Sequence, residues 1–283
     1  MRLENRRTSR NVKDQRGGGG KVAVAGGGLG LLVLIIGSQL LGVDLTQFAS
    51  LLEDPNGSQS SEYQPYQGTP EEEALLEESS KVLALTEDVF GQIVPEQLGI
   101  RYREPTMTVY TNQTQTACGA GSAAMGPFYC SGDDGIYLDL SFYRTLERQL
   151  QSKGDFARAY VVAHEAAHHL QNLTGTTRAV QQAKQGRSDA QRNFLTRLQE
   201  LQADCYAGVW AHHVQERFNI LDGADLREAL NAAFQIGDDT LAKNAGRRPV
   251  EAAFTHGTGD ERQTWFVRGF KTGDLNECNT FDS

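Results

Sequence analysis

Apolar residues recur at helical spacing along most of this chain, and each such segment ends at a Gly or Pro residue or at a residue that caps helices. Several of these segments begin with Ser or Thr followed three residues later by Glu or Gln, which is the capping-box pattern of a helix start. We therefore predict long helices separated by short loops. They cover residues 70–90, 141–150, 156–173, 188–218, 222–245 (where Gly237 could interrupt the helix) and 258–271.

Two short segments alternate polar and apolar residues instead, which is the pattern of a strand with one buried face. They are residues 106–111 and 136–140, and the second follows a Gly-Asp-Asp-Gly turn. A few strands followed by long helices, without an internal repeat, predict an α+β fold that is mostly helical with a small sheet. We place this folded domain at residues 70–283.

Residues 22–43 carry no charge and are rich in Leu, Ile, Val and Gly, and such a run is long enough to cross a hydrocarbon core of about 30 Å. Residues 1–21 hold seven Lys or Arg against two acidic residues, and basic flanks stay in the cytoplasm. We therefore predict a cytoplasmic segment at 1–21, one retained transmembrane helix at 22–43 and a body outside the cytoplasm. Residues 44–69, rich in Pro, Gly and Ser, are predicted to be a flexible linker.

A cleaved signal peptide is the main alternative for residues 22–43. The apolar region of a signal peptide usually spans about 7–15 residues and ends at a small-residue cleavage site, and neither feature matches this run. A buried helix of a soluble protein is the other alternative, and the glycine run at residues 17–20 argues against it.

The charge balance limits the partners of the protein. The chain has 27 Lys and Arg against 36 Asp and Glu, for a formal net charge of −9 at pH 7. Because seven of the basic residues lie in residues 1–21, the rest of the chain is strongly acidic. Nucleic-acid binding requires a basic face, so we expect no nucleic-acid partner. Nothing in the pattern indicates an oligomeric state.

The predicted helix at residues 156–173 contains the motif His164-Glu165-Ala166-Ala167-His168. Residues at positions i and i+4 lie on one helix face about 6 Å apart, which suits two ligands of a tetrahedral zinc ion. Glu165 points about 100° away around the helix and could take a proton from a zinc-bound water. The alternative, a pair of core histidines, is disfavoured because the motif lies inside an uninterrupted helix.

A catalytic zinc takes three protein ligands and leaves one position for water. We predict Glu200 as the third ligand, on the helix at residues 188–218 and 32 residues after His168. Asp204 follows one turn later, where it could accept the spare N–H of a ligand histidine and fix the ring orientation. The alternative is a solvated acidic pair on a helix surface.

This arrangement resembles that of the gluzincins, the thermolysin-like metallopeptidases. The fuller pattern resembles the bacterial family of neutral zinc metallopeptidases, whose members look like membrane-anchored zincins. The resemblance covers most of the chain: the basic N-terminus with its glycine run, the apolar segment, and residues 164–169, 201–208 and 255–258. It implies a zincin-like domain in a bacterial cell membrane and a zinc-dependent endopeptidase that acts on peptides or proteins, with Glu165 as the base.

His256 lies in the loop before the last predicted helix, where it could donate to the oxyanion of a tetrahedral intermediate. The alternatives are an idle loop histidine at this position and Arg248 as the donor. By analogy with zincin architecture, we expect a peptide to pair along residues 136–140. Three histidines are expected to be structural: His169, His212 and His213.

The chain has four cysteines, and an even number in a body outside the cytoplasm indicates two disulfides. Three pairings are possible. Cys118 and Cys130 form the favoured local pair, in which case Cys205 and Cys278 would tie the C-terminal tail to the helix that carries Glu200. The alternative is buried free thiols; zinc ligation is disfavoured because the chain has no C-x-x-C pair.

Two functions compete at this point. The first is a membrane-anchored zinc peptidase, and the second is a non-catalytic zincin-fold protein that binds an envelope partner through a domain held by structural zinc. A structural zinc normally has four protein ligands, so three ligands with Glu165 beside them favour the enzyme. A peptidase that cleaves only itself is a third possibility.

Overall fold

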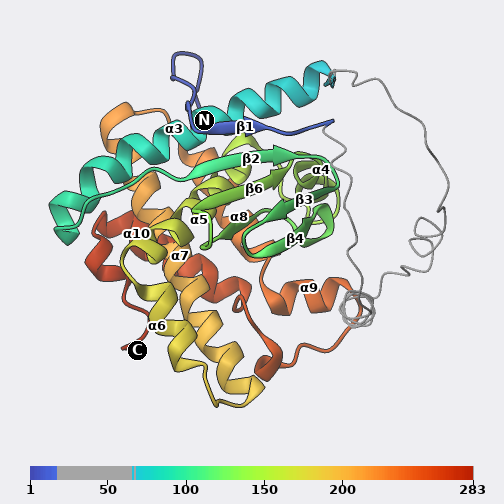
Figure 1. Cartoon of the computed structure of the whole chain (residues 1–283), viewed down its shortest axis with the longest axis vertical. Coiled ribbons are helices and arrows are strands. Elements are labelled where there is room, and N and C mark those ends of the chain that lie inside the picture. Colours follow the sequence, from blue (N-terminus) through green and yellow to red (C-terminus); the bar gives the residue numbers. More distant parts are fainter. Residues whose placement is uncertain (18–65, 67, 283) are drawn as a thin grey trace. The chain divides into compact units, whose positions relative to one another are not determined.

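A computed structural model describes residues 1–17, 66 and 68–282, and helices dominate this part of the chain (Figure 1). The described helices are α3 (Pro70–Leu98), α4 (Ser141–Arg148), α5 (Asp155–Leu173), α6 (Thr176–Ala183), α7 (Asp189–Phe218), α8 (Gly223–Gln235), α9 (Asp238–Asn244) and α10 (Gly259–Thr272). Short 3-10 turns add η2 (Ala123–Met125), η3 (Glu251–Ala253) and η4 (Leu275–Cys278). The prediction of a mostly helical α+β fold is confirmed for the described residues.

Local capping explains why the predicted helix starts are close to the observed ones. Capping boxes open α3 at Thr69, α7 at Ser188 and α10 at Thr258. The predicted helix at residues 222–245 is divided into α8 and α9 at Gly237. A Cβ at Gly237 would lie 2.2 Å from the backbone nitrogen of Gly259, so only glycine permits this close approach. Helix α6 was not expected.

The main sheet has the strand order β1-β2-β6-β5. Its strands are β1 (Val12–Asp14), β2 (Thr106–Tyr110), β6 (Gly135–Asp139) and β5 (Phe128–Cys130); β3 (Gln113–Thr116) and β4 (Gly119–Ser122) form a separate hairpin. The first three strands are parallel, whereas β5 runs antiparallel to β6.

The position of β6 inside the sheet corrects one expectation. Strand β2 pairs with one side of β6 over residues 135–139, and β5 pairs with the other side over residues 135–137. The expected pairing of a peptide along the whole of residues 136–140 is therefore blocked at residues 136 and 137, which β5 already pairs. The free edge of the sheet on this side belongs to β5.

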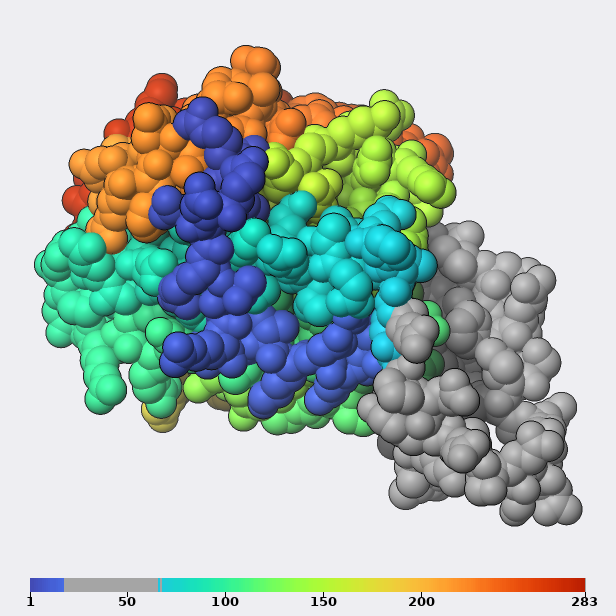
Figure 2. All heavy atoms as spheres, turned by 90° about the horizontal axis from the view of Figure 1, so that it is seen from above, coloured from blue at the N-terminus to red at the C-terminus, as the bar shows by residue number. Residues whose placement is uncertain are grey.

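Residues 1–17 are part of the folded unit that contains residues 68–282. Strand β1 pairs in parallel with β2, and the backbone N–H of Ser9 donates to the Ser80 carbonyl of α3 at 3.1 Å. Figure 2 shows this N-terminal segment lying against α3. The prediction of a separate segment at residues 1–21, with the fold starting at residue 70, is therefore wrong for residues 1–17.

Charge complementarity explains this docking. Arg7 lies 2.9 Å from a carboxylate oxygen of Glu87 and 2.6 Å from one of Asp88, and Arg16 lies 2.8 Å from one of Glu73. All three acidic residues belong to α3. The basic cluster thus matches an acidic helix face, which charge counting along the sequence does not distinguish from a membrane flank.

The predicted apolar span at residues 22–43 and most of the predicted linker lie outside the described residues. Within residues 1–17, 66 and 68–282, no helix combines the length and apolar content that a membrane crossing needs.

Helices α7 and α10 approach each other closely at two glycines. A Cβ at Gly208 would lie 2.1 Å from the carbonyl oxygen of Phe266, and a Cβ at Gly269 would lie 2.0 Å from that of Cys205. The disulfide between Cys205 and Cys278 joins α7 to η4, directly after α10. Side chains from α10 can therefore reach groups on α7 that face the interior.

Candidate metal centre

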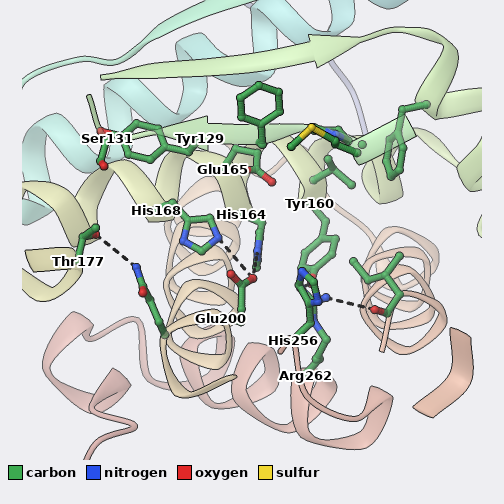
Figure 3. Close-up of a pocket in the computed structure, with 18 of the residues that line it drawn as sticks. Tyr129, Ser131, Tyr160, His164, Glu165, His168, Thr177, Glu200, His256 and Arg262 are labelled. Atoms are coloured by element: carbon green, nitrogen blue, oxygen red, sulfur yellow. Dashed lines mark hydrogen bonds and ion pairs between the residues drawn. The ribbon is translucent and has the colours of Figure 1, made fainter. Parts of the chain in front are cut away.

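Three predicted ligands converge from two helices (Figure 3). The Oε2 atom of Glu200, on α7, lies 3.1 Å from Nε2 of His164 and 3.4 Å from Nε2 of His168, both on α5. Ligand atoms around a tetrahedral zinc ion with bonds near 2.1 Å are about 3.4 Å apart. The separations therefore fit one ion of this size between the three side chains.

The outer nitrogens of both rings are already used. Nδ1 of His164 lies 2.9 Å from Oδ1 of Asp204, and Nδ1 of His168 lies 2.8 Å from Oε1 of Gln171. Since these oxygens accept, each neutral ring carries its proton on Nδ1 and presents an Nε2 lone pair to Glu200. Two lone pairs facing a carboxylate oxygen repel it, and a divalent cation removes that repulsion.

The electrostatics of the site show the same preference for positive charge. Burial lowers the pKa of His164, but the charge and hydrogen bond of Asp204, together with Glu200, outweigh burial and raise the pKa to about 10. Burial raises the pKa of Glu200, but His168 and His164 outweigh burial and hold it well below its usual range. The three side chains therefore favour positive charge between them, and either ring protons or a metal ion can supply that charge.

Glu165 lines the same cavity as the three ligands (Figure 3). Its side chain is buried, with 7% exposure of the residue, and burial raises its pKa although the neighbouring histidines oppose the shift. A carboxylate with a raised pKa is a better proton acceptor than an ordinary one. Glu165 therefore has both the position and the basicity for proton transfer.

Asp204 is the centre of a buried network that sequence reasoning found only in part. It is fully buried, and its two carboxylate oxygens accept from Arg262 at 2.8 and 3.0 Å as well as from His164. The hydroxyl of Tyr160 also donates to Asp204. Burial raises the pKa of Asp204, but Arg262 and His164 outweigh burial and lower it. The carboxylate is thus kept ionised and aimed at the ligand ring.

A cavity of about 560 Å³ opens at the predicted ligands. Phe128 and Tyr129 of β5 and the adjacent Ser131 form part of its wall, so the free sheet edge lies beside the metal centre. Apolar residues form another part of the wall: Met125, Phe142, Leu150, Val161, Ile236 and Leu241. Polar residues also line it: Thr177, Gln181, Lys184 and Gln199. An extended chain that paired with β5 would meet both apolar and polar side chains of this wall.

His256 lies in the cavity wall as well. Its Nδ1 is 3.3 Å from Oδ1 of Asp238, whose Oδ2 accepts the backbone N–H groups of His256 itself and of both neighbouring residues. Partial burial lowers the pKa of His256, but Asp238 and the charge of Glu200 outweigh burial and raise it. Arg248, the alternative donor, is exposed and is not among the cavity-lining residues.

His169 has a structural role, as expected. The ring is fully buried, its Nε2 donates to the carbonyl of Arg103 at 2.6 Å, and its Nδ1 lies 3.0 Å from the hydroxyl of Tyr129. Burial lowers the pKa of His169. The ring thereby fastens the edge strand β5 to α5 rather than entering the metal centre.

The comparison with known proteins agrees with the zinc chemistry of this centre. The chain matches a family model described as "Putative neutral zinc metallopeptidase" over residues 1–281. This chain belongs to that family. The match to the family includes residues 1–17, which the structure places in the folded unit.

Curated relatives of this chain come from Escherichia coli and Mycobacterium tuberculosis. The "Uncharacterized protein YpfJ" of Escherichia coli strain K12 is 43% identical over 291 residues, which cover 99% of each chain. The "Uncharacterized protein Rv2575" of Mycobacterium tuberculosis is 41% identical over 192 residues, which cover 64% of each chain. No solved structure matches the chain significantly.

Several members of the site gave no sequence signal. No motif contains Tyr160, Gln171, Asp238 or Arg262. Gln171 contacts His168 one helix turn earlier, and the other three contact residues that are distant in the sequence.

The structure also forms the two favoured disulfides, Cys118–Cys130 and Cys205–Cys278. The first ties the turn between β3 and β4 to β5 at the cavity, and the second ties η4 to α7.

Proposed function

We propose that this protein is a zinc-dependent metallopeptidase with His164, His168 and Glu200 as the metal ligands. The observation that carries the proposal is a set of three convergent ligands beside Glu165 in an open cavity. A structural zinc would normally have a fourth protein ligand, whereas a catalytic zinc keeps a position for water. Bound zinc would supply a water of lowered pKa and polarise the scissile carbonyl.

The residues of the chain perform the remaining steps. Glu165 accepts the proton of the attacking water and returns it to the leaving amine. His256, oriented by Asp238, donates a hydrogen bond to the developing oxyanion. Asp204 holds the ring of His164 in the tautomer that presents Nε2.

The substrate proposed for this site is a peptide or an extended protein segment. β5 is an edge strand at the cavity wall, and an exposed edge can pair with an extended backbone. The apolar residues along the cavity would then accept apolar side chains of the substrate. We propose β5 in place of residues 136–140 as the pairing strand.

The test compares the full-length protein with its Glu165→Gln variant, which keeps the size of the side chain. Zinc content is measured together with cleavage of an unfolded protein substrate. We expect retained zinc and a loss of cleavage of about 100-fold or more. Equal cleavage by both zinc-loaded proteins would refute the role of Glu165. A zinc-loaded wild type that cleaves nothing would favour a non-catalytic binding protein.

The full chain is the proper material for this test. A fragment that starts at residue 70 would lose β1 and the ion pairs between residues 1–17 and α3. A negative result with such a fragment would reflect a damaged fold as much as an inactive site.

We further propose that the body lies outside the cytoplasm of a bacterial cell and is attached to the membrane through residues 22–43. Two disulfides support an oxidising compartment. Because residues 1–17 pack on the body, we place them on the same side as the body. This revises both the expected cytoplasmic N-terminus and the expected single crossing by residues 22–43, since one crossing would put the two flanks on opposite sides of the membrane. Protease treatment of intact spheroplasts should remove an N-terminal epitope tag together with the body. Protection of the tag while the body is digested would contradict this arrangement.

A further inference from the structure

A second group of potential metal ligands lies near the C-terminal end of α7. His212 and His213 are consecutive, and Glu216 follows one turn later. One ligand atom from each of the three lies within 4.8 Å of the others. Oε2 of Glu216 is 3.2 Å from Nδ1 of His213 and 4.0 Å from Nε2 of His212. These separations lie near the 3.4 Å or so expected around a tetrahedral ion, so small side-chain movements would complete the site.

The outer nitrogens of both rings are fixed by backbone carbonyls. Nδ1 of His212 donates to the carbonyl of Phe270 at 2.8 Å, and Nε2 of His213 donates to that of Gly273 at 2.8 Å. A carbonyl oxygen only accepts, so each of these nitrogens carries a proton. In a neutral ring the other nitrogen then has a lone pair, and both lone pairs face the carboxylate of Glu216.

This arrangement repeats the organisation of the first centre. In both places two rings give their outer N–H groups to oxygen acceptors and turn their remaining nitrogens toward one carboxylate oxygen. Outer partners of this kind fix the tautomer and orientation of metal-binding histidines. Three acceptor atoms held together in this way favour a cation between them.

The site is preorganised on its buried side and open on the other. The ring of His212 packs so closely on Gly273 that a Cβ there would lie 2.5 Å from the ring. The side chain of His213 is 13% exposed, that of His212 is 31% exposed and that of Glu216 is 61% exposed. An ion could therefore enter from solvent and fill its remaining positions with water.

We propose that His212, His213 and Glu216 bind a second divalent ion of the zinc class, separate from the first centre. Two imidazoles and a carboxylate are a donor set that suits Zn²⁺, with Ni²⁺ and Cu²⁺ as competitors. Both rings also hold the C-terminal end of α10 through Phe270 and Gly273, so the ion stiffens the contact between α7 and α10. This revises the expectation that His212 and His213 are purely structural.

The experiment measures zinc stoichiometry in the full-length protein by equilibrium dialysis. The wild type should bind two equivalents. A His164→Ala/Glu200→Ala variant, which lacks the first centre, should retain one. Adding Glu216→Gln to that variant should weaken binding of the remaining equivalent by about tenfold or more, because losing a ligand should cost at least as much as losing a partner behind a ligand. Glu277→Gln, which changes another half-exposed carboxylate, is the matched control and should leave binding unchanged.

A second variant keeps the local packing. His213→Gln removes a ligand nitrogen but retains an amide donor for the carbonyl of Gly273, and it should also weaken zinc binding in the His164→Ala/Glu200→Ala background. Circular dichroism confirms that each variant is folded. The proposal is overturned if the His164→Ala/Glu200→Ala protein binds no zinc, or if its zinc affinity is unchanged by both Glu216→Gln and His213→Gln. Neither result bears on the peptidase, which depends on the first centre.

Discussion

Replacing Arg262 tests how the metal centre is held. Arg262 is 2% exposed and donates two hydrogen bonds to Asp204, which is fully buried. An Arg262→Met change fills similar volume but leaves the Asp204 carboxylate buried without its cation. Breaking a buried ion pair from one side costs about 3–5 kcal/mol. For a chain of this size, a loss of about 3 kcal/mol lowers the unfolding midpoint by about 6–12 °C.

The same change also affects the metal. Because Arg262 lowers the pKa of Asp204, its removal raises that pKa, and a protonated Asp204 no longer serves as an anionic acceptor for His164. We expect zinc affinity to fall by about 10–100-fold, as for other changes behind a metal ligand. Because the pKa of Asp204 is lowered in the folded state, its ionised carboxylate contributes to the stability of the wild-type fold at neutral pH. This contribution is lost as the pH falls through the folded-state pKa.

The assay combines thermal unfolding of the metal-free protein with zinc competition against a chromophoric chelator. Arg262→Lys is the conservative control, because it keeps the charge but cannot make the paired hydrogen bonds. It should recover part of the stability and part of the zinc affinity. An unfolding midpoint within 2 °C or so of the wild type for Arg262→Met, together with unchanged zinc affinity, would refute the reasoning.

Three further predictions follow from other contacts. Deleting residues 1–17 should lower the unfolding midpoint, because β1 and the ion pairs to α3 are lost, whereas an unchanged midpoint in a thermal scan would show that the segment does not dock. Asp238→Asn should shift the alkaline limb of the pH–rate profile to lower pH, because the raised pKa of His256 depends on Asp238 and its proton is then lost earlier; an unmoved limb would exclude His256 as a protonated donor. Replacing Cys205 and Cys278 together by Ser should cost about 4 kcal/mol in urea unfolding, since the disulfide closes a loop of 73 residues, and a loss below about 1 kcal/mol would mean that the tail is held by its other contacts.

The sequence by itself determined the features that depend on neighbours along the chain. Capping residues and helical periodicity placed most helices, because these signals act within one or two turns. The spacing of His164 and His168 placed both rings on one face of α5 for the same reason. Glu200 and Asp204 were predicted from the ligand count that zinc requires and from their one-turn spacing on a second helix.

Tertiary structure decided everything that joins distant segments. Whether Glu200 reaches the two rings depends on the packing of α7 on α5, and the approach of Arg262 to Asp204 depends on the close contact of α7 with α10 at two glycines. β1 is three residues long and mostly exposed, so it has no periodicity of its own and forms only because β2 is beside it. The basic N-terminal segment was misread because Arg7 and Arg16 pair with acidic residues of α3. Local patterns specify elements and faces, whereas pairing across the fold is decided by which faces meet.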